Sequence, residues 1–176
     1  LRDFRELAGM SRGQGDRLRL FGETVTVGEE YGRVTTPQQG DLAEIVASVE
    51  EARRQADYVI FSSHSHESGT TNNYPADFIV EVAHAVIDAG ADVFLAHGPH
   101  VVRGVEIYRG KPIFYSLGDF LFQNETVPRQ PWDNYENYRL GPEAVAPDFF
   151  DARQRSGGFP ARPQVWESFV AVVGFD

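Results

Sequence analysis

Four of the five histidines in the sequence lie in two short segments whose spacing is typical of metal ligands. His64 and His66 belong to "HSHE", which ends at Glu67, and His97 and His100 belong to "HGPH". Neutral imidazole is a common ligand of zinc and also suits iron, nickel and copper. Residues two apart in an extended segment point the same way, so His64 and His66 could share one ion. These segments therefore predict a metal site.

The second segment contains two residues that restrict the backbone. Gly98 allows a close backbone approach, and Pro99 stiffens the turn, so together they fix the direction of His100. A metal-free fold, in which the loop histidines only make hydrogen bonds, remains an alternative. The fifth histidine, His84, lies inside a predicted helix, and we assign it a structural role.

A predicted βαβ unit positions both histidine segments. The stretch "YVIFSS", 58–63, is a strand with few polar residues, which predicts that it is covered on both faces. A helix follows over 75–90, opened by Pro75 and closed by Gly90, and a second strand covers 91–96. The carboxyl ends of parallel strands meet at one edge of a sheet, where ligands gather. Both segments follow such ends, so we expect them to converge.

Other elements flank this unit. A helix over 40–57 has apolar residues at helical spacing, and Asp41 with Glu44 matches a capping box. We predict a hairpin that turns at Arg109 and Gly110. A short strand pair is predicted around Gly22 and Gly28, within 17–34. A long loop excursion with one or two helical turns is predicted over 121–165, and a last strand over 166–175. The aromatic side chains of the excursion either form a flap over the site or anchor the loop; they are Trp132, Tyr135, Tyr138, Phe149 and Phe150.

Composition limits the classes of function. A chain of 176 residues fits one domain over 1–176, and no apolar run is long enough to span a membrane. The absence of cysteine excludes disulfides and thiolate metal ligands. A net charge of −10 argues against nucleic acid as a partner. An acidic protein that handles anions needs a local positive centre, which a metal ion can supply.

Three segments resemble the CapA family, the bacterial poly-γ-glutamate capsule synthesis proteins, which are similar to the calcineurin-like metallophosphoesterases. They are "SSHSHES", "IDAGADVFLAHGPHVVRGVEIYRGKPIFYSLGDF" and "WESFVAVVGFD". The resemblance is strongest over 41–123. It implies an α/β fold, the C-terminal half of a four-layered α-β-β-α metallophosphoesterase-like sandwich. It also implies two divalent metal ions (Mn, Fe or Zn), with His64 at the first ligand position and His97 and His100 at the second.

The sequence departs from the family pattern at two positions. The family's "HWG" reads "HSH", which makes His66 an extra ligand or proton donor, and its Gly-Asn-Phe reads Gly-Asp-Phe, which places a carboxylate at Asp119. The family's early motifs have no counterpart before residue 41. We therefore expect an N-terminal half outside this chain to supply the other ligands and any signal peptide or anchor, so localisation is not predicted.

The resulting hypothesis is a metal-dependent hydrolase or phosphoesterase of capsule synthesis. In it, His66, Glu67 and Asp119 are catalytic, the metal ligands are the four loop histidines, and Arg103 and Glu106 bind an anionic small-molecule or polymer substrate. A solvated arginine is the alternative for Arg103. The alternative function is a capsule-assembly protein that binds an acidic polymer without cleaving it, and metal content together with turnover separates the two.

Overall fold

The computed structural model divides the chain into two compact units, Leu1–Arg33 and Val34–Asp176. In the first unit, β1 (Arg17–Leu20) pairs antiparallel with β2 (Glu23–Thr26), which confirms the predicted strand pair. Gly22 and Gly28 lie outside the described residues. The structure describes residues 17–20, 23–26, 32–123, 126–159 and 161–175.

Helix α2 (Gln39–Gln55) opens the second unit and begins earlier than the predicted capping box requires. Its N-cap is Gln38, whose side-chain oxygen accepts a hydrogen bond from the backbone N–H of Asp41 at 2.7 Å. The predicted capping role of Asp41 is therefore wrong. Asp41 instead lies in the first helical turn, where its negative charge interacts favourably with the helix dipole.

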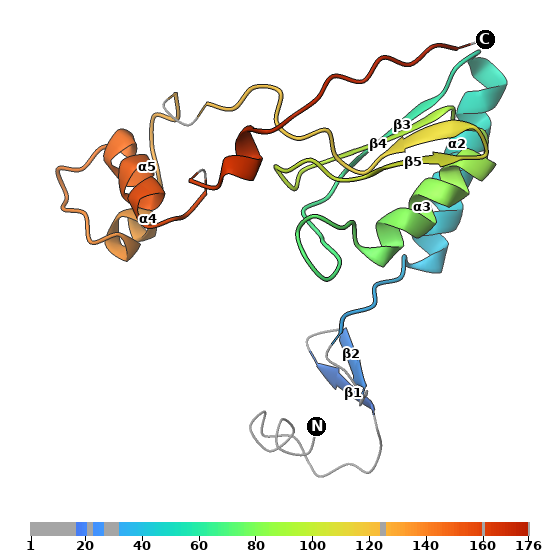
Figure 1. Cartoon of the computed structure of the whole chain (residues 1–176). Coiled ribbons are helices and arrows are strands. Elements are labelled where there is room, and N and C mark those ends of the chain that lie inside the picture. Colours follow the sequence, from blue (N-terminus) through green and yellow to red (C-terminus); the bar gives the residue numbers. More distant parts are fainter. Residues whose placement is uncertain (1–16, 21–22, 27–31, 124–125, 160, 176) are drawn as a thin grey trace. The chain divides into compact units, whose positions relative to one another are not determined.

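A four-stranded sheet forms the centre of this unit (Figure 1). Its strands are β3 (Ile60–His64), β4 (Val93–His97), β6 (Lys111–Phe114) and β5 (Val105–Tyr108), in that spatial order. The first three run parallel, and β5 runs antiparallel to β6. Helix α3 (Asp77–Asp88) connects β3 to β4 and confirms the predicted βαβ unit. The architecture is mixed α/β, and the strand register places His64 directly opposite His97.

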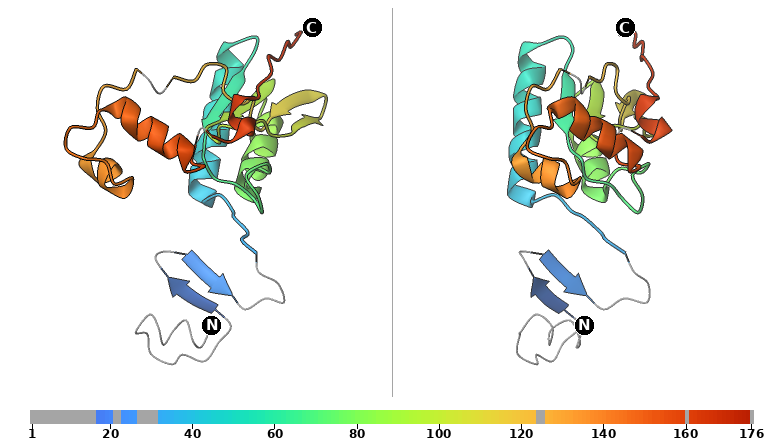
Figure 2. Two further views of the ribbon diagram at one scale, coloured as in Figure 1. Left: turned by 60° about the vertical axis from the view of Figure 1, so that its left-hand side comes forward. Right: turned by 90° about the vertical axis from the view of Figure 1, so that its left-hand side faces the viewer.

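Helices α2 and α3 lie side by side and share one core with the sheet (Figures 1 and 2). The core contains the fully buried side chains of Val86, Phe94 and Ile113. Because side chains alternate along a strand, the opposite sheet face carries the neighbouring residues. On that face Ile60 is 59% exposed and Ile107 is 67% exposed. The prediction that the first strand is covered on both faces is therefore wrong for the described chain, because β3 is an edge strand with only one face against the helices.

The turn between β5 and β6 is the one predicted from sequence. Arg109 and Gly110 have φ angles of 51° and 78°, so both lie in the left-handed region that a tight two-residue hairpin requires. This turn places Glu106 opposite Ile113.

The segment 121–165 is more helical than the predicted one or two turns. It contains α4 (Trp132–Asn137), the ten-residue α5 (Ala146–Arg155) and the start of a 3-10 helix (Pro163–Trp166). The ring of Phe149 contacts those of Tyr135, Tyr138 and Phe150, with centroid distances of 5.1–6.3 Å. These aromatic residues therefore join α4 to α5, as the anchoring alternative predicts.

The predicted last strand, 166–175, is wrong. A single bridge joins Ser168 to Gly118, and beyond it the described chain is extended without a ladder. Val172 is 95% exposed there. Alternating apolar residues form a strand only where a neighbouring backbone completes the hydrogen bonds.

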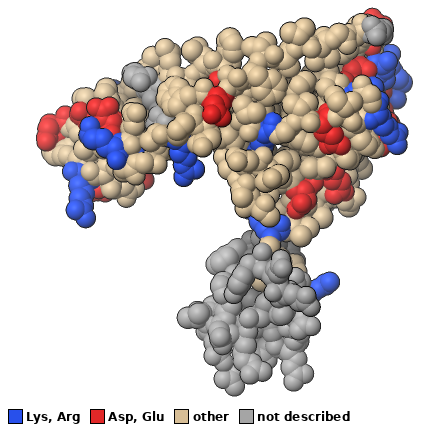
Figure 3. Space-filling view, in the orientation of Figure 1, with Lys and Arg blue, Asp and Glu red and all other residues tan. Residues whose placement is uncertain are grey.

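Two surface properties bear on the class of protein. Within the part of the chain that the structure describes, no helix has the length and apolar character needed to cross a bilayer. On the face of the second unit in Figure 3, basic and acidic side chains are interspersed.

Candidate metal centre

Three histidines at the carboxyl ends of β3 and β4 form a chain of hydrogen bonds. His64 Nδ1 lies 2.8 Å from His97 Nδ1, and His64 Nε2 lies 3.2 Å from His66 Nε2. Ser62 Oγ extends the chain, 3.1 Å from His97 Nε2. The predicted convergence of the two histidine segments is therefore confirmed, whereas metal binding stays a prediction.

The chemistry of this chain follows from the two nitrogens of each ring. A neutral imidazole carries one N–H donor and one acceptor nitrogen. The chain is thus satisfied when every proton points towards Ser62, and equally when every proton points towards His66. Both directions are available without charging a ring. Burial, followed by the neighbouring His64, lowers the pKa of His97, which favours the neutral form that binds metals.

Imidazole nitrogens suit a divalent metal in chemistry, but the described donor set supplies only part of a coordination shell. His64 takes part in both nitrogen pairs, at 2.8 Å and 3.2 Å, so the three rings bring two pairs of nitrogens together. Among the described residues, no group of three or more His, Cys, Asp or Glu side chains is arranged to hold an ion.

His100 extends the cluster with a carboxylate behind it. Its ring centroid lies 5.4 Å from that of His66, and its Nδ1 lies 2.9 Å and 3.1 Å from the two carboxylate oxygens of Asp119. A carboxylate at Nδ1 fixes the orientation of the ring and directs Nε2 elsewhere, as is common behind metal-bound histidines. Asp119 therefore lies behind His100 and positions its ring.

The turn between His97 and His100 is tightly constrained, as the Gly-Pro pair predicts. Gly98 has a φ of 120°, and a Cβ atom added there would lie 2.9 Å from the carbonyl oxygen of Ser65 and 3.1 Å from His64 Nε2. His100 itself has a φ of 57°, which is uncommon for a residue with a side chain. Such backbone strain is often found at functional sites.

Two aromatic residues beside His100 were missed by sequence reasoning. The ring centroids of Phe159 and Phe122 lie 5.0 Å and 5.9 Å from that of His100. Both belong to the segment 121–165, so this segment contacts the histidine edge through Phe122 and Phe159 and not through the aromatic residues named in the sequence analysis. No sequence pattern links these two residues to a histidine at least 22 positions earlier.

The structure gives Arg103 a buried position. Its side chain donates to the backbone carbonyls of Asn72 at 2.9 Å and Glu67 at 3.0 Å, and the residue is 4% exposed. These bonds hold the loop that carries His66, which favours a structural role over the solvated alternative. Substrate binding by Arg103 stays a prediction, as does catalysis by the exposed Glu67.

Glu106 lies apart from the histidine edge, on the sheet face that α3 covers. Its carboxylate oxygens lie 2.9 Å from His84 Nε2 and 2.6 Å from the Tyr115 hydroxyl, which donates to it. The hydrogen bond from Tyr115, with a further one from His84, lowers the pKa of Glu106. The ring of His84 also stacks on Tyr108. This network fits the structural role predicted for His84.

The fold and this edge define an α/β domain with a candidate metal site at the ends of its parallel strands. The chain belongs to the bacterial capsule synthesis protein PGA_cap family, whose model matches residues 13–124, and the predicted CapA resemblance is thereby confirmed.

Three curated relatives illustrate how much of a longer protein this chain matches. Uncharacterized protein y4sH of Sinorhizobium fredii is 35% identical over 185 residues, covering 100% of this chain and 40% of that protein. The PGA biosynthesis protein CapA of Bacillus subtilis is 42% identical over 77 residues, 44% of this chain and 20% of that protein. A probable polyglutamine synthesis accessory protein of Mycobacterium tuberculosis is 38% identical over 95 residues, 53% and 24% respectively. The chain thus spans less than half the length of these relatives.

Proposed function

We propose that this chain contributes the histidine edge of a metal-dependent hydrolase or phosphoesterase that acts in capsule or poly-γ-glutamate synthesis. The role in synthesis is supported by family membership and by the names of the Bacillus and Mycobacterium relatives. The single observation that carries the metal-dependent activity is the contact of His64 with both His97 and His66 at 2.8 Å and 3.2 Å.

In this proposal His64, His66, His97 and His100 are metal ligands of a centre for two divalent ions, Mn, Fe or Zn. When bound, the ions supply Lewis-acid polarisation of a phosphoryl or carbonyl oxygen. Glu67, exposed at the edge, donates a proton to the leaving group, or His66 does so if it is not a metal ligand. Asp119 holds His100 in one orientation through Nδ1. Arg103 keeps the loop of His66 in place.

The four-layered α-β-β-α sandwich is part of the same proposal. A sheet face with exposed Ile60, Val105 and Ile107 is what a second sheet would cover. Because the relatives are longer than this chain, we propose that residues outside it complete the ligand set. On its own, the chain is then expected to bind at most one ion, weakly, and to show little turnover.

A second candidate function is an assembly protein that binds an acidic polymer without cleaving it. Two observations favour it: the Mycobacterium relative is named an accessory protein, and no complete group of metal ligands lies among the described residues. The two candidates differ in metal content and in turnover.

The test measures both properties on the same samples. Zinc and manganese are titrated calorimetrically into this chain and into the full-length protein, followed by assays with a phosphomonoester, a phosphodiester and a γ-glutamyl anilide. We expect weak binding by this chain, and two sites with hydrolysis by the full-length protein. A full-length protein that binds no metal and cleaves none of the three compounds would contradict the hydrolase and leave the assembly role.

A further inference from the structure

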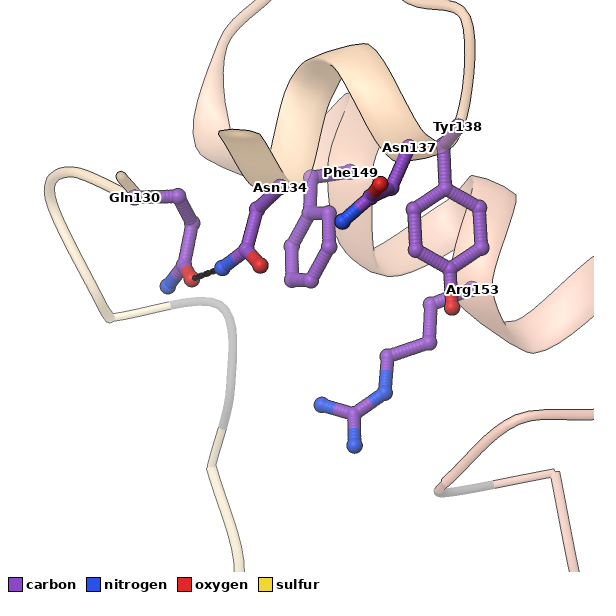
Figure 4. A pocket seen from close by; sticks show the side chains of 6 residues that line it. All are labelled: Gln130, Asn134, Asn137, Tyr138, Phe149 and Arg153. Carbon is purple, nitrogen blue, oxygen red and sulfur yellow. Dashed lines mark hydrogen bonds between the residues drawn. The ribbon is translucent and has the colours of Figure 1, made fainter. Parts of the chain in front are cut away.

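A polar cavity lies between α4 and α5 and shares no lining residue with the histidine edge. Its volume is about 560 Å³, within the range of small-molecule sites. Figure 4 shows the lining side chains around one open space, contributed by the segment before α4 and by both helices. They are Gln130, Asn134, Asn137, Tyr138, Phe149 and Arg153.

Arg153 provides the cavity with a positive charge. The guanidinium carbon lies 5.5 Å from the centroid of the Phe159 ring, and Arg153 pairs with no carboxylate among the described residues. By contrast, Arg155 on the same helix pairs with Asp151 at 3.8 Å. Arg153 is half-buried as a residue, and its guanidinium, which has no anion among the described residues, is a ready partner for a ligand carboxylate in a chain of net charge −10.

The rest of the lining is rich in carboxamides. Gln130 and Asn134 bond to each other at 2.9 Å, and Asn137 lies one helical turn further along α4. Carboxamides both donate and accept hydrogen bonds, so they match the N–H and C=O groups of another amide. A simple anion would use the arginine alone, whereas a ligand with carboxylates and amide links would use both kinds of lining group.

Phe159 connects this cavity to the histidine edge. One ring contacts both the Arg153 guanidinium, at 5.5 Å, and the His100 imidazole, at 5.0 Å. Because one ring contacts both groups, an acidic ligand of a few residues reaches from the Arg153 guanidinium to the His100 imidazole.

We propose that the α4–α5 cavity is a binding subsite for an acidic amide-linked chain, held by Arg153 through a carboxylate and by the carboxamides through its amide links. This inference deepens the proposed function, because it identifies where a polymer substrate that reaches His100 is bound. Its relevance to substrate choice rests on the proposed function. Binding at the cavity itself requires no metal.

The test is calorimetric binding of γ-linked tri-glutamate to the full-length protein in metal-free buffer, so the result does not depend on the histidine edge. Arg153→Gln is expected to weaken binding about tenfold or more, since it removes a charged hydrogen-bonding partner. Arg155→Gln removes the same charge two residues away, and we expect it to change the affinity less than about threefold. Thermal unfolding of each variant is recorded in parallel.

Two further measurements keep the proposal falsifiable. Asn137 is exposed at a helix end, so Asn137→Leu should keep the fold and still weaken binding of the ligand several-fold. This variant tests the proposal if Arg153→Gln does not fold. The same chain with its carboxylates converted to carboxamides, and inorganic phosphate, should each bind much more weakly. Equal losses in Arg153→Gln and Arg155→Gln, or equal binding of either comparison ligand, would overturn the proposal.

Discussion

The two faces of one sheet hold histidines in opposite chemical settings. His84 bonds to the Glu106 carboxylate at 2.9 Å and stacks on Tyr108 with 4.0 Å between ring centroids. His64, on the other face, contacts the nitrogens of two further histidines. The carboxylate takes up the Nε2 atom of His84, whereas each nitrogen pair of His64 shares one proton, which a cation could replace. The difference lies in the partners of each residue rather than in the residue type.

The largest expected effect is on metal binding when His64 is replaced. Because His64 takes part in both nitrogen pairs, His64→Ala should lower the affinity of the full-length protein for zinc or manganese by about 100-fold or more. His84→Ala removes the same imidazole from the opposite face and should leave that affinity within about threefold. Calorimetric titration of both variants measures the contrast, and equal losses would erase the distinction between the two settings.

The turn that joins the two segments should show the next largest effect. Gly98→Ala places a side chain at a φ of 120° and against His64 Nε2, so metal affinity should fall about tenfold and stability by about 1–3 kcal/mol. Pro99→Ala, which only loosens the turn, should cost less in both. A lower melting temperature with unchanged metal affinity would show that the turn serves the fold alone.

Ser62 should have a smaller influence. Its hydroxyl lies behind His97, so Ser62→Ala should weaken metal binding by about tenfold or less without measurable unfolding. Ser63→Ala, on the other face of the same strand, is the matched control. If both substitutions have the same effect, the hydroxyl does not orient the imidazole.

Glu106 should affect stability and leave metal binding unchanged. The hydrogen bond from Tyr115, with that from His84, lowers the pKa of Glu106, and this stabilises the fold above the usual glutamate pKa and is lost as pH falls through the lowered value. Glu106→Gln should therefore reduce the free energy of unfolding by about 1 kcal/mol at neutral pH and by less below about pH 4. Urea unfolding against pH, with the exposed Glu81→Gln as control, measures this. A pH-independent difference would contradict the assigned cause.

The convergence of the histidines could be predicted because parallel strands bring their carboxyl ends together whatever their side chains are. The contact of His100 with Asp119 could not, because it depends on how the chain returns after the β5–β6 hairpin. Its contacts with Phe122 and Phe159 depend in the same way on the path of the excursion.

The errors have a common physical origin. The last segment has a strand-like pattern, yet the pattern does not specify which backbone completes its hydrogen bonds. Asp41 is a good N-cap residue, but Gln38 reaches its N–H from an earlier position. The sequence around Arg103 is that of a surface arginine, and only the folded loop supplies the two backbone carbonyls that accept its hydrogen bonds in a buried position. In each case the observed structure depends on a hydrogen-bonding partner that lies outside the sequence segment used for the prediction.

The open sheet face also governs how this chain behaves as a laboratory sample. At low ionic strength a net charge of −10 keeps copies apart, even though Ile60, Val105 and Ile107 are at least half exposed on one surface. Added salt shortens the range of that repulsion to a few ångströms and strengthens apolar attraction when the anion is a kosmotrope such as sulfate. Colloidal stability should therefore decline steeply with ammonium sulfate, and dilute, low-salt buffers are the conditions in which the isolated chain stays dispersed.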